Sequence, residues 1–242
     1  MGGGSGYCID LVDGKEVYHK ERDNDLPYEI EHIYPDYSLY PQYTDNCSYG
    51  FLTRGCPRGC GFCHVASKEG KCSYKVADLD EFWKGQKDIA LCDPNLLACA
   101  DHRDLLQQLI DSKARVEFNQ GMDVRLVNDK NIDLIKAIKL KSIHFAFDRW
   151  QDKDTVEPKL RMFAEETDFN RNKGKVTVYI LVNYDTELSQ DLYRIELCRK
   201  LNFQPFVMIY DKEHCDSIYR KLQRYCNPFI FWSTSSFSEY QG

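Results

Sequence analysis

Apolar and polar positions alternate regularly along most of the chain, from about residue 49 onward. Short apolar runs that suit β-strands are separated by longer stretches in which apolar residues recur at helical spacing. The expected strands are Gly50–Thr53, Ile89–Cys92, Arg115–Phe118, Ser142–Phe147, Val176–Val182 and Pro205–Tyr210. The expected helices are Asp78–Lys87, Arg103–Ser112, Asn131–Lys139, Glu157–Glu166, Ser189–Lys200 and Asp216–Tyr225.

This repeated order of strand and helix predicts an α/β fold with a parallel sheet. Because crossovers between parallel strands are right-handed, consecutive units wind into an open sheet or curl toward a barrel. We predict a partial (β/α)6 TIM-like barrel over residues 49–242. Residues 1–48 are rich in Tyr and Pro and have no long period, so we expect an irregular N-terminal arm packed on that domain.

Composition and charge narrow the class of protein. The 242 residues are 43% hydrophobic and 29% charged, which is typical of a globular domain with a sizeable core. No apolar run approaches the roughly 20 residues of a membrane span, and the first residues lack a secretory pattern, so we expect a cytoplasmic protein with no membrane partner. The net charge of -6 argues against nucleic acid as the main partner.

The cysteines carry the strongest chemical pattern. An odd count of 11 without a secretory segment does not suit a disulfide framework. Most are scattered, but three are compact in Cys56-Pro-Arg-Gly-Cys60-Gly-Phe-Cys63. Structural zinc usually takes two separated pairs, although His64 is a conceivable fourth ligand. Three thiolates on a cubane iron–sulfur cluster leave one iron open to an outside molecule, which indicates catalysis.

The Cys-x-x-x-Cys-x-x-Cys spacing, with Phe62 before the last cysteine, resembles the radical S-adenosylmethionine superfamily. The resemblance implies a [4Fe-4S] cluster on Cys56, Cys60 and Cys63, with S-adenosylmethionine on the open iron. It also implies reductive cleavage to a 5′-deoxyadenosyl radical that abstracts hydrogen from a substrate. An electron donor such as flavodoxin or ferredoxin and an anaerobic or well-reduced cytoplasm follow from the same resemblance.

The resemblance extends to polar residues after the strands, over about residues 49–210. Asp93 or Asn95 stands where many relatives have a Gly-Gly-Glu segment for the amino group of the ligand. Phe62 is expected on the adenine side of S-adenosylmethionine, and the polar strand ends are expected to hold its methionine moiety. The full set of expected cofactor contacts is Phe62, Asp93, Asn95, Gln120, Asp123, Arg125, Asp148 and Asn183. His144 lies in an apolar run and is expected to be a core histidine.

Two alternatives remain open from the sequence. The segment Gly2-Gly3-Gly4-Ser5-Gly6-Tyr7 resembles the exit of a cobalamin-binding domain, and we expect a shortened form without bound cobalamin. The competing class is a non-catalytic iron–sulfur or zinc protein with a structural or redox-sensing role. The substrate is equally open, because the residues suit a nucleotide, a peptide or a small metabolite.

Overall fold

The computed structural model describes residues 9–12, 15–18, 28–228 and 230–241. The glycine-rich segment 2–7, with its resemblance to a domain exit, lies outside the described residues. Within the N-terminal part, β1 (Ile9–Val12) and β2 (Lys15–Tyr18) form an antiparallel pair. Two short helices follow, α1 (Tyr28–Glu31) and α2 (Pro41–Thr44). The N-terminal arm, which was expected to be irregular, therefore contains a strand pair and two short helices.

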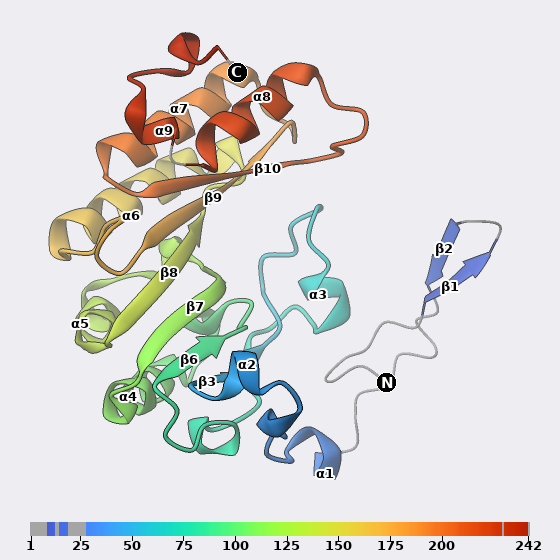
Figure 1. The fold of residues 1–242 in the computed structure, drawn as a ribbon, viewed down its shortest axis with the longest axis vertical. Helices are drawn as coiled ribbons and strands as arrows, with labels where there is room; N and C mark the ends of the chain where they lie inside the picture. Colours follow the sequence, from blue (N-terminus) through green and yellow to red (C-terminus); the bar gives the residue numbers. More distant parts are fainter. Residues whose placement is uncertain (1–8, 13–14, 19–27, 229, 242) are drawn as a thin grey trace.

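Six parallel strands form the main sheet, in the order β10-β9-β8-β7-β6-β3 (Figure 1). Each strand pairs with the next one of this sheet along the chain, so β3 and β10 stand at its two ends. This confirms the predicted α/β class with a parallel sheet. The strands are β3 (Cys47–Gly50), β6 (Asp88–Leu91), β7 (Arg115–Met122), β8 (Leu140–Ala146), β9 (Val176–Val182) and β10 (Gln204–Ile209).

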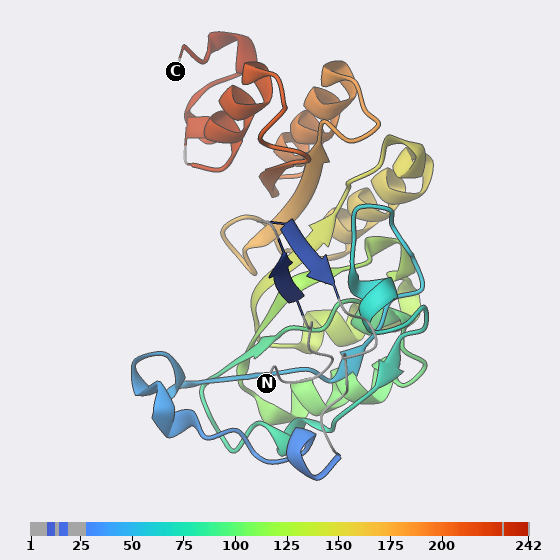
Figure 2. The ribbon, with the colours of Figure 1, turned by 90° about the vertical axis from the view of Figure 1, so that its right-hand side faces the viewer.

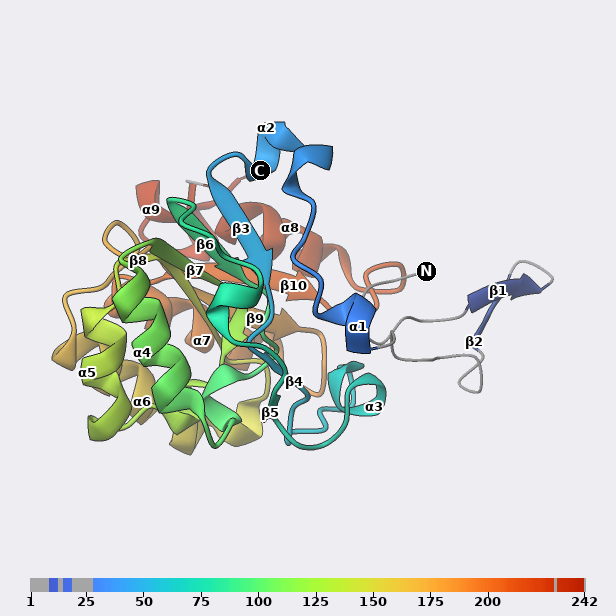
Figure 3. The same cartoon turned by 90° about the horizontal axis from the view of Figure 1, so that it is seen from below.

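Four long helices connect the strands from β6 to β10, and a fifth follows β10. Figures 1 and 3 show α4–α6 on one side of the sheet, whereas α3 lies on the other. Asn128 and Asp216 cap α5 and α8 by accepting hydrogen bonds from backbone amides of the first turn. The helices are α4 (His102–Ser112), α5 (Asp129–Ala137), α6 (Lys153–Glu166), α7 (Leu188–Lys200) and α8 (Ser217–Cys226). Each was expected within a few residues of these bounds.

Two expected elements differ from the structure. The first strand of the main sheet is Cys47–Gly50 rather than Gly50–Thr53, so both its start and its end were misplaced. It stops at Gly50 because Leu52 and Thr53 donate their amides to the Asp93 side chain instead of continuing the ladder. The expected helix 78–87 is only a short 3-10 turn, Leu79–Glu81. Gly85 then adopts a positive φ of 102°, which ends the helical path.

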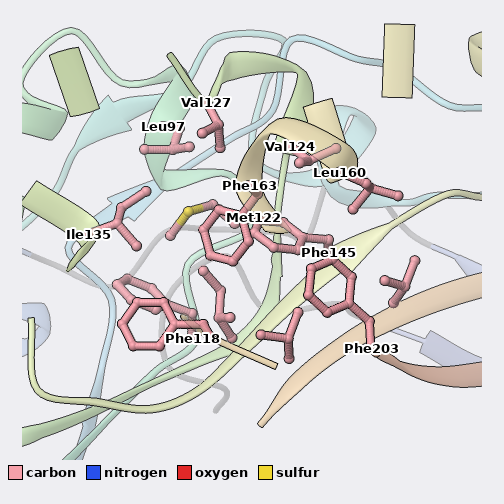
Figure 4. Packing of buried hydrophobic residues seen from close by; sticks show 14 of the residues in the cluster. Leu97, Phe118, Met122, Val124, Val127, Ile135, Phe145, Leu160, Phe163 and Phe203 are labelled. Carbon is pink, nitrogen blue, oxygen red and sulfur yellow. The ribbon is translucent and has the colours of Figure 1, made fainter. Parts of the chain in front are cut away.

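The hydrophobic core lies between the sheet and its helices. In β8 and β9, Ile143, Phe145, Val178 and Ile180 are fully buried. Figure 4 shows Phe145 close to rings and aliphatic side chains of the same cluster, and its ring centroid lies 4.8 Å from that of Phe163. Burial of this apolar surface is the main term that stabilises the domain. The alternate positions of the two strands point to the opposite face.

The segment before β3 packs on the domain through polar contacts. The Tyr37 hydroxyl donates to the Phe82 carbonyl at 2.9 Å and accepts from the Tyr49 amide at 3.0 Å. His32 pairs with Glu81 from the short turn 79–81. Figure 2 shows this segment beside the first strands of the sheet. Among the described residues, no helix is both long enough and apolar enough to cross a bilayer.

Candidate functional site

The three clustered cysteines lie in a loop, residues 55–64, called here the cysteine loop. It joins β4 (Thr53–Arg54) to the short helix α3 (Val65–Lys68). The Cys56 amide donates to the Gly70 carbonyl at 3.2 Å, which closes the loop on the far end of α3. Gly55 has a φ of 77°, and a Cβ there would lie 2.0 Å from the Cys72 carbonyl oxygen. Only glycine therefore fits at the start of the loop.

Cys60 interacts electrostatically with the other two cysteines of the motif. Burial raises the pKa of Cys60, and the neighbouring Cys63 and Cys56 thiols raise it further. Arg125 acts in the opposite direction, and Asp148 adds to the rise. Arg58 of the loop pairs with Asp123, so the cysteine loop faces the residues that follow β7. In parallel α/β proteins this carboxyl edge of the sheet is where ligands bind.

The donor set of the loop can be compared with the metals considered from the sequence. Among the described residues, no three His, Cys, Asp or Glu side chains converge on one point that could hold a metal ion. A mononuclear zinc site requires such convergence. A cubane iron–sulfur cluster also needs its thiolates around one compact centre, so this finding favours neither metal. The loop supplies three cysteines at close spacing, and thiolates are the ligands that such a cluster takes.

The end of β7 is displaced from the regular ladder. Its pairing with β8 shifts between Phe118 and Met122, and Gly121 has a φ of 108°. Side chains from the next two strands approach the carbonyls of this bulge. His144 Nδ1 lies 2.6 Å from the Phe118 oxygen, and the Tyr179 hydroxyl donates to the Asn119 oxygen at 3.1 Å. A bulge of this kind redirects the residues after it, here toward the cysteine loop.

Asp123 links the cysteine loop to the sheet. Arg58 Nε donates to Asp123 Oδ2 at 2.5 Å, and Arg125 Nε donates to Oδ1 at 2.7 Å. Burial acts to raise the pKa of Asp123, but the two guanidinium groups outweigh it and hold the pKa below its usual value. Arg125 also donates to Asp152 at 2.7 Å. Gln120, the third residue expected from this segment, is exposed.

Two carboxyl groups follow β6 and β8, that of the buried Asp93 and that of the half-buried Asp148. Desolvation raises the pKa of Asp93 and of Asp148 to about 6 in each case. Asp93 accepts from the Leu52 amide at 3.1 Å and from the Thr53 hydroxyl at 2.6 Å, so it fastens the chain just before the cysteine loop. Asp148 accepts from the Leu181 amide at 3.0 Å through Oδ1 alone. Its second oxygen makes no hydrogen bond among the described residues.

Asn95 reaches the first cysteine of the loop. Its Nδ2 lies 3.5 Å from Cys56 Sγ in hydrogen-bonding geometry. The Asn95 backbone oxygen accepts from the Ser73 hydroxyl at 3.0 Å, and the residue is only 2% exposed. Its Oδ1 has no partner among the described residues. Asn95 therefore contacts a cysteine of the loop directly, whereas Asp93 supports the loop through the backbone.

Aromatic side chains bound the other side of the loop. The Phe62 and Tyr184 rings meet edge to face with centroids 5.0 Å apart, and Tyr184 meets Tyr210 at 4.8 Å. Asn183 donates to the Tyr210 carbonyl at 3.0 Å and has a φ of 63°. A Cβ at Gly61 would lie 2.8 Å from the Tyr184 hydroxyl. The segment after β9 thus contacts the loop through Tyr184, next to the expected Asn183, and Tyr184 in turn contacts Tyr210 after β10.

One buried ion pair near the site is absent from the residues expected from sequence. Arg194 and Asp191, both on α7, form an ion pair in which neither side chain is exposed. Arg194 also donates to the carbonyls of Phe147 and Leu181, which flank Asp148 on adjacent strands. The only local sign of this role is a pair of opposite charges three residues apart on a helix.

Comparison with models of protein families finds no match to the chain, and comparison with curated proteins finds none either. The site must therefore be interpreted from its own geometry. The contacts and charge interactions described above connect most of the expected residues, namely Cys56, Cys60, Cys63, Phe62, Asn95, Asp123, Arg125 and Asp148. Asp93 supports the loop, Asn183 is tied to Tyr210, and Gln120 is exposed.

Proposed function

We propose that the protein is a radical S-adenosylmethionine enzyme whose [4Fe-4S] cluster is bound by Cys56, Cys60 and Cys63. The observation that carries the proposal is the contact of the cysteine loop with the carboxyl edge of the sheet, through Arg58 with Asp123 and Phe62 with Tyr184. When bound, the cluster would supply the electron that cleaves S-adenosylmethionine to a 5′-deoxyadenosyl radical, which takes hydrogen from a substrate. The resemblance of the cysteine motif and its position after the first strand support the same chemistry.

The charged residues around the loop support an anionic cofactor. A cluster with three thiolates is negatively charged, and a nearby positive charge favours the thiolate form of cysteine. Arg125 acts in this direction on Cys60. Arg58 pairs with Asp123, so its positive charge is held at the loop rather than free in solvent. Arg125 would offset part of the thiolate charge, while its pairing with Asp123 and Asp152 holds it beside the loop.

The polar and aromatic groups suggest where S-adenosylmethionine would be held. Asp148 retains one oxygen without a hydrogen bond among the described residues, which suits a cationic or hydroxyl group of a ligand. Phe62 and Tyr184 form an aromatic wall beside the loop, which suits stacking or edge contact with adenine. Gln120 and Asn183 remain proposed contacts at the same edge.

The fold supports this assignment at a coarser level. The six strands follow the order of the sequence, as in a partial (β/α)6 barrel, and we propose that the sheet belongs to this type. In that arrangement the face not covered by α4–α6 would hold the substrate and exclude water from a reactive intermediate. A flavodoxin- or ferredoxin-type protein of a reducing cytoplasm would supply the electron.

The decisive experiment compares two cysteine variants with the wild type under anaerobic conditions. After reconstitution with iron and sulfide, we expect the wild type to convert S-adenosylmethionine to 5′-deoxyadenosine when reduced by dithionite. Cys60→Ala is expected to lose this activity. Cys226→Ala is the matched control, because Cys226 is buried in α8 away from the loop, and it is expected to retain iron and product formation.

The same samples distinguish the proposed enzyme from the alternative, a non-catalytic iron–sulfur or zinc protein. A structural zinc site would contain zinc and no visible charge-transfer absorption. A saturated, non-catalytic cluster would absorb in the visible, but its electron paramagnetic resonance spectrum would not change on addition of S-adenosylmethionine. Cleavage that persists in Cys60→Ala, or a cluster insensitive to S-adenosylmethionine in the wild type, would contradict the proposal.

A further inference from the structure

Asn95 is buried beside the cysteine loop in an arrangement that its own packing does not explain. It is 2% exposed and its side-chain Oδ1 has no partner among the described residues, although its Nδ2 faces Cys56 Sγ at 3.5 Å. An unsatisfied buried polar atom destabilises the folded state. A leucine of similar volume would avoid that cost. The amide therefore stands at a position where an apolar residue would favour folding.

The backbone around Asn95 holds the amide in place. The Asn95 carbonyl accepts from the Ser73 hydroxyl at 3.0 Å and from the Ala98 amide at 3.2 Å. Ser73 follows Cys72, whose carbonyl packs against Gly55 at the start of the loop. The residue that contacts Cys56 is thus fixed to the same segment that shapes the loop. Such supporting contacts preserve the direction of a hydrogen bond when a ligand binds.

The orientation of the amide suits a deprotonated cysteine. A thiolate has no proton to donate and accepts hydrogen bonds only, so the donor Nδ2 is the correct end of the amide to face it. Hydrogen bonds to the sulfurs are among the factors that set the potential of an iron–sulfur cluster. The one-electron reduction adds one negative charge to the cluster and its thiolates, and the electron comes from an external low-potential donor. A donor N–H stabilises the more negative state more strongly.

We propose that Asn95 is a positioning residue that raises the reduction potential of the cluster through its hydrogen bond to Cys56. This inference rests on the proposed function, since it requires a cluster on the cysteine loop. Asn95 acts on the cluster through Cys56 and takes no part in the transfer of hydrogen. Its effect is electrostatic, so it is present before any substrate binds.

The test is a redox titration of the reconstituted protein, followed by electron paramagnetic resonance without substrate. Asn95→Leu removes the donor at similar volume and is expected to lower the equilibrium constant for reduction about tenfold, equivalent to about 59 mV for one electron. Asn95→Asp keeps the shape but places a negative acceptor beside the thiolate, so its potential is expected below that of Asn95→Leu. Asn227→Leu is the control, because the Asn227 side chain, just after α8, bonds among the described residues only to the backbone of Val207 in β10.

The outcomes separate this inference from the proposed function. The inference is supported if the reduction potential is highest in the wild type and Asn227→Leu, lower in Asn95→Leu and lowest in Asn95→Asp. Equal reduction potentials in the wild type and both Asn95 variants would overturn the inference about Asn95. The proposed function would still stand in that case if the cluster depends on Cys60 and responds to S-adenosylmethionine. If Asn95→Leu does not fold, the isosteric Asn95→Asp decides the result alone. A wild type that assembles no cluster overturns both.

Discussion

Arg194 and Asp191 form an ion pair on α7 in which both side chains are completely shielded from solvent. The pair is not isolated, because Arg194 also donates to the carbonyls of Phe147 and Leu181. These carbonyls belong to the ends of β8 and β9, and Asp148 directly follows the first of them. A helix on the covered face of the sheet thereby fixes the geometry of a carboxyl group at the candidate site.

Removing Arg194 alone is expected to be strongly destabilising. Arg194→Met leaves the Asp191 carboxylate buried without a partner, which costs about 3–5 kcal/mol of unfolding free energy. The double variant Arg194→Met/Asp191→Leu removes the stranded charge and is expected to recover part of that loss. Urea unfolding of the two single variants and the double variant measures the coupling. Equal stability of Arg194→Met and the double variant would show that the stranded charge is not the cause.

The desolvated carboxyl group of the half-buried Asp148 predicts a pH-dependent effect on stability. Burial raises its pKa to about 6 from an ordinary value of 3.8, so the folded protein binds this proton more tightly than the unfolded chain. Its contribution is present below about pH 4 and is lost as the pH rises through about 6. Asp148→Asn is therefore expected to gain about 1–3 kcal/mol relative to the wild type between pH 4 and pH 7.

The measurement is urea unfolding of both proteins across this pH range, with the difference plotted against pH. Asp154→Asn serves as the control, because its carboxyl side chain is 97% exposed and the difference from the wild type is expected to stay flat. A flat difference for Asp148→Asn as well would mean that the carboxyl group is not held in a desolvated site. The same variant is expected to lose 5′-deoxyadenosine formation while it gains stability above pH 6.

Two glycines of the cysteine loop provide a paired test of its backbone. Both have positive φ, 77° at Gly55 and 56° at Gly59, but only Gly55 is crowded, with a Cβ position 2.0 Å from the Cys72 oxygen. Gly59→Ala is expected to cost only the left-handed backbone penalty, about 1–2 kcal/mol. Gly55→Ala must in addition displace the segment around Cys72, and is expected to be the less stable and to bind less iron.

Thermal unfolding and iron content after reconstitution measure the two effects on the same samples. If Gly59→Ala loses as much stability and iron as Gly55→Ala, the close packing of Gly55 against Cys72 is not what shapes the loop.

Periodicity predicted most of the fold because it reports local properties of the chain. Strand Val176–Val182 and helices such as 103–112 were expected almost as observed, since their apolar faces repeat within a few residues. The expected helix 78–87 was wrong. Its composition suits a helix, but Gly85 and the capping contacts between Asp78 and Glu81 hold only one short turn. The end of the first strand was misplaced because Asp93, distant in sequence, takes its amides.

The candidate site, like the fold, was predicted from the sequence only in part. The three cysteines and the acidic residues after the strands were visible from sequence, because motif spacing and strand order are both written along the chain. The roles of these residues were not, since they depend on which group each side chain meets. Asp93 and Asn95 looked interchangeable as ligand contacts, yet one holds the backbone of Thr53 and the other faces Cys56.

The chain alone therefore established the alternation of strands and helices, the compact cysteine motif and the edge of the sheet where chemistry was expected. Tertiary structure decided the partners: Arg58 with Asp123, Phe62 with Tyr184, and Arg194 with the ends of β8 and β9. The physical reason is the range of the forces involved. Hydrophobic periodicity acts between near neighbours in sequence, whereas hydrogen bonds, desolvation and ion pairs depend on residues that only folding brings together.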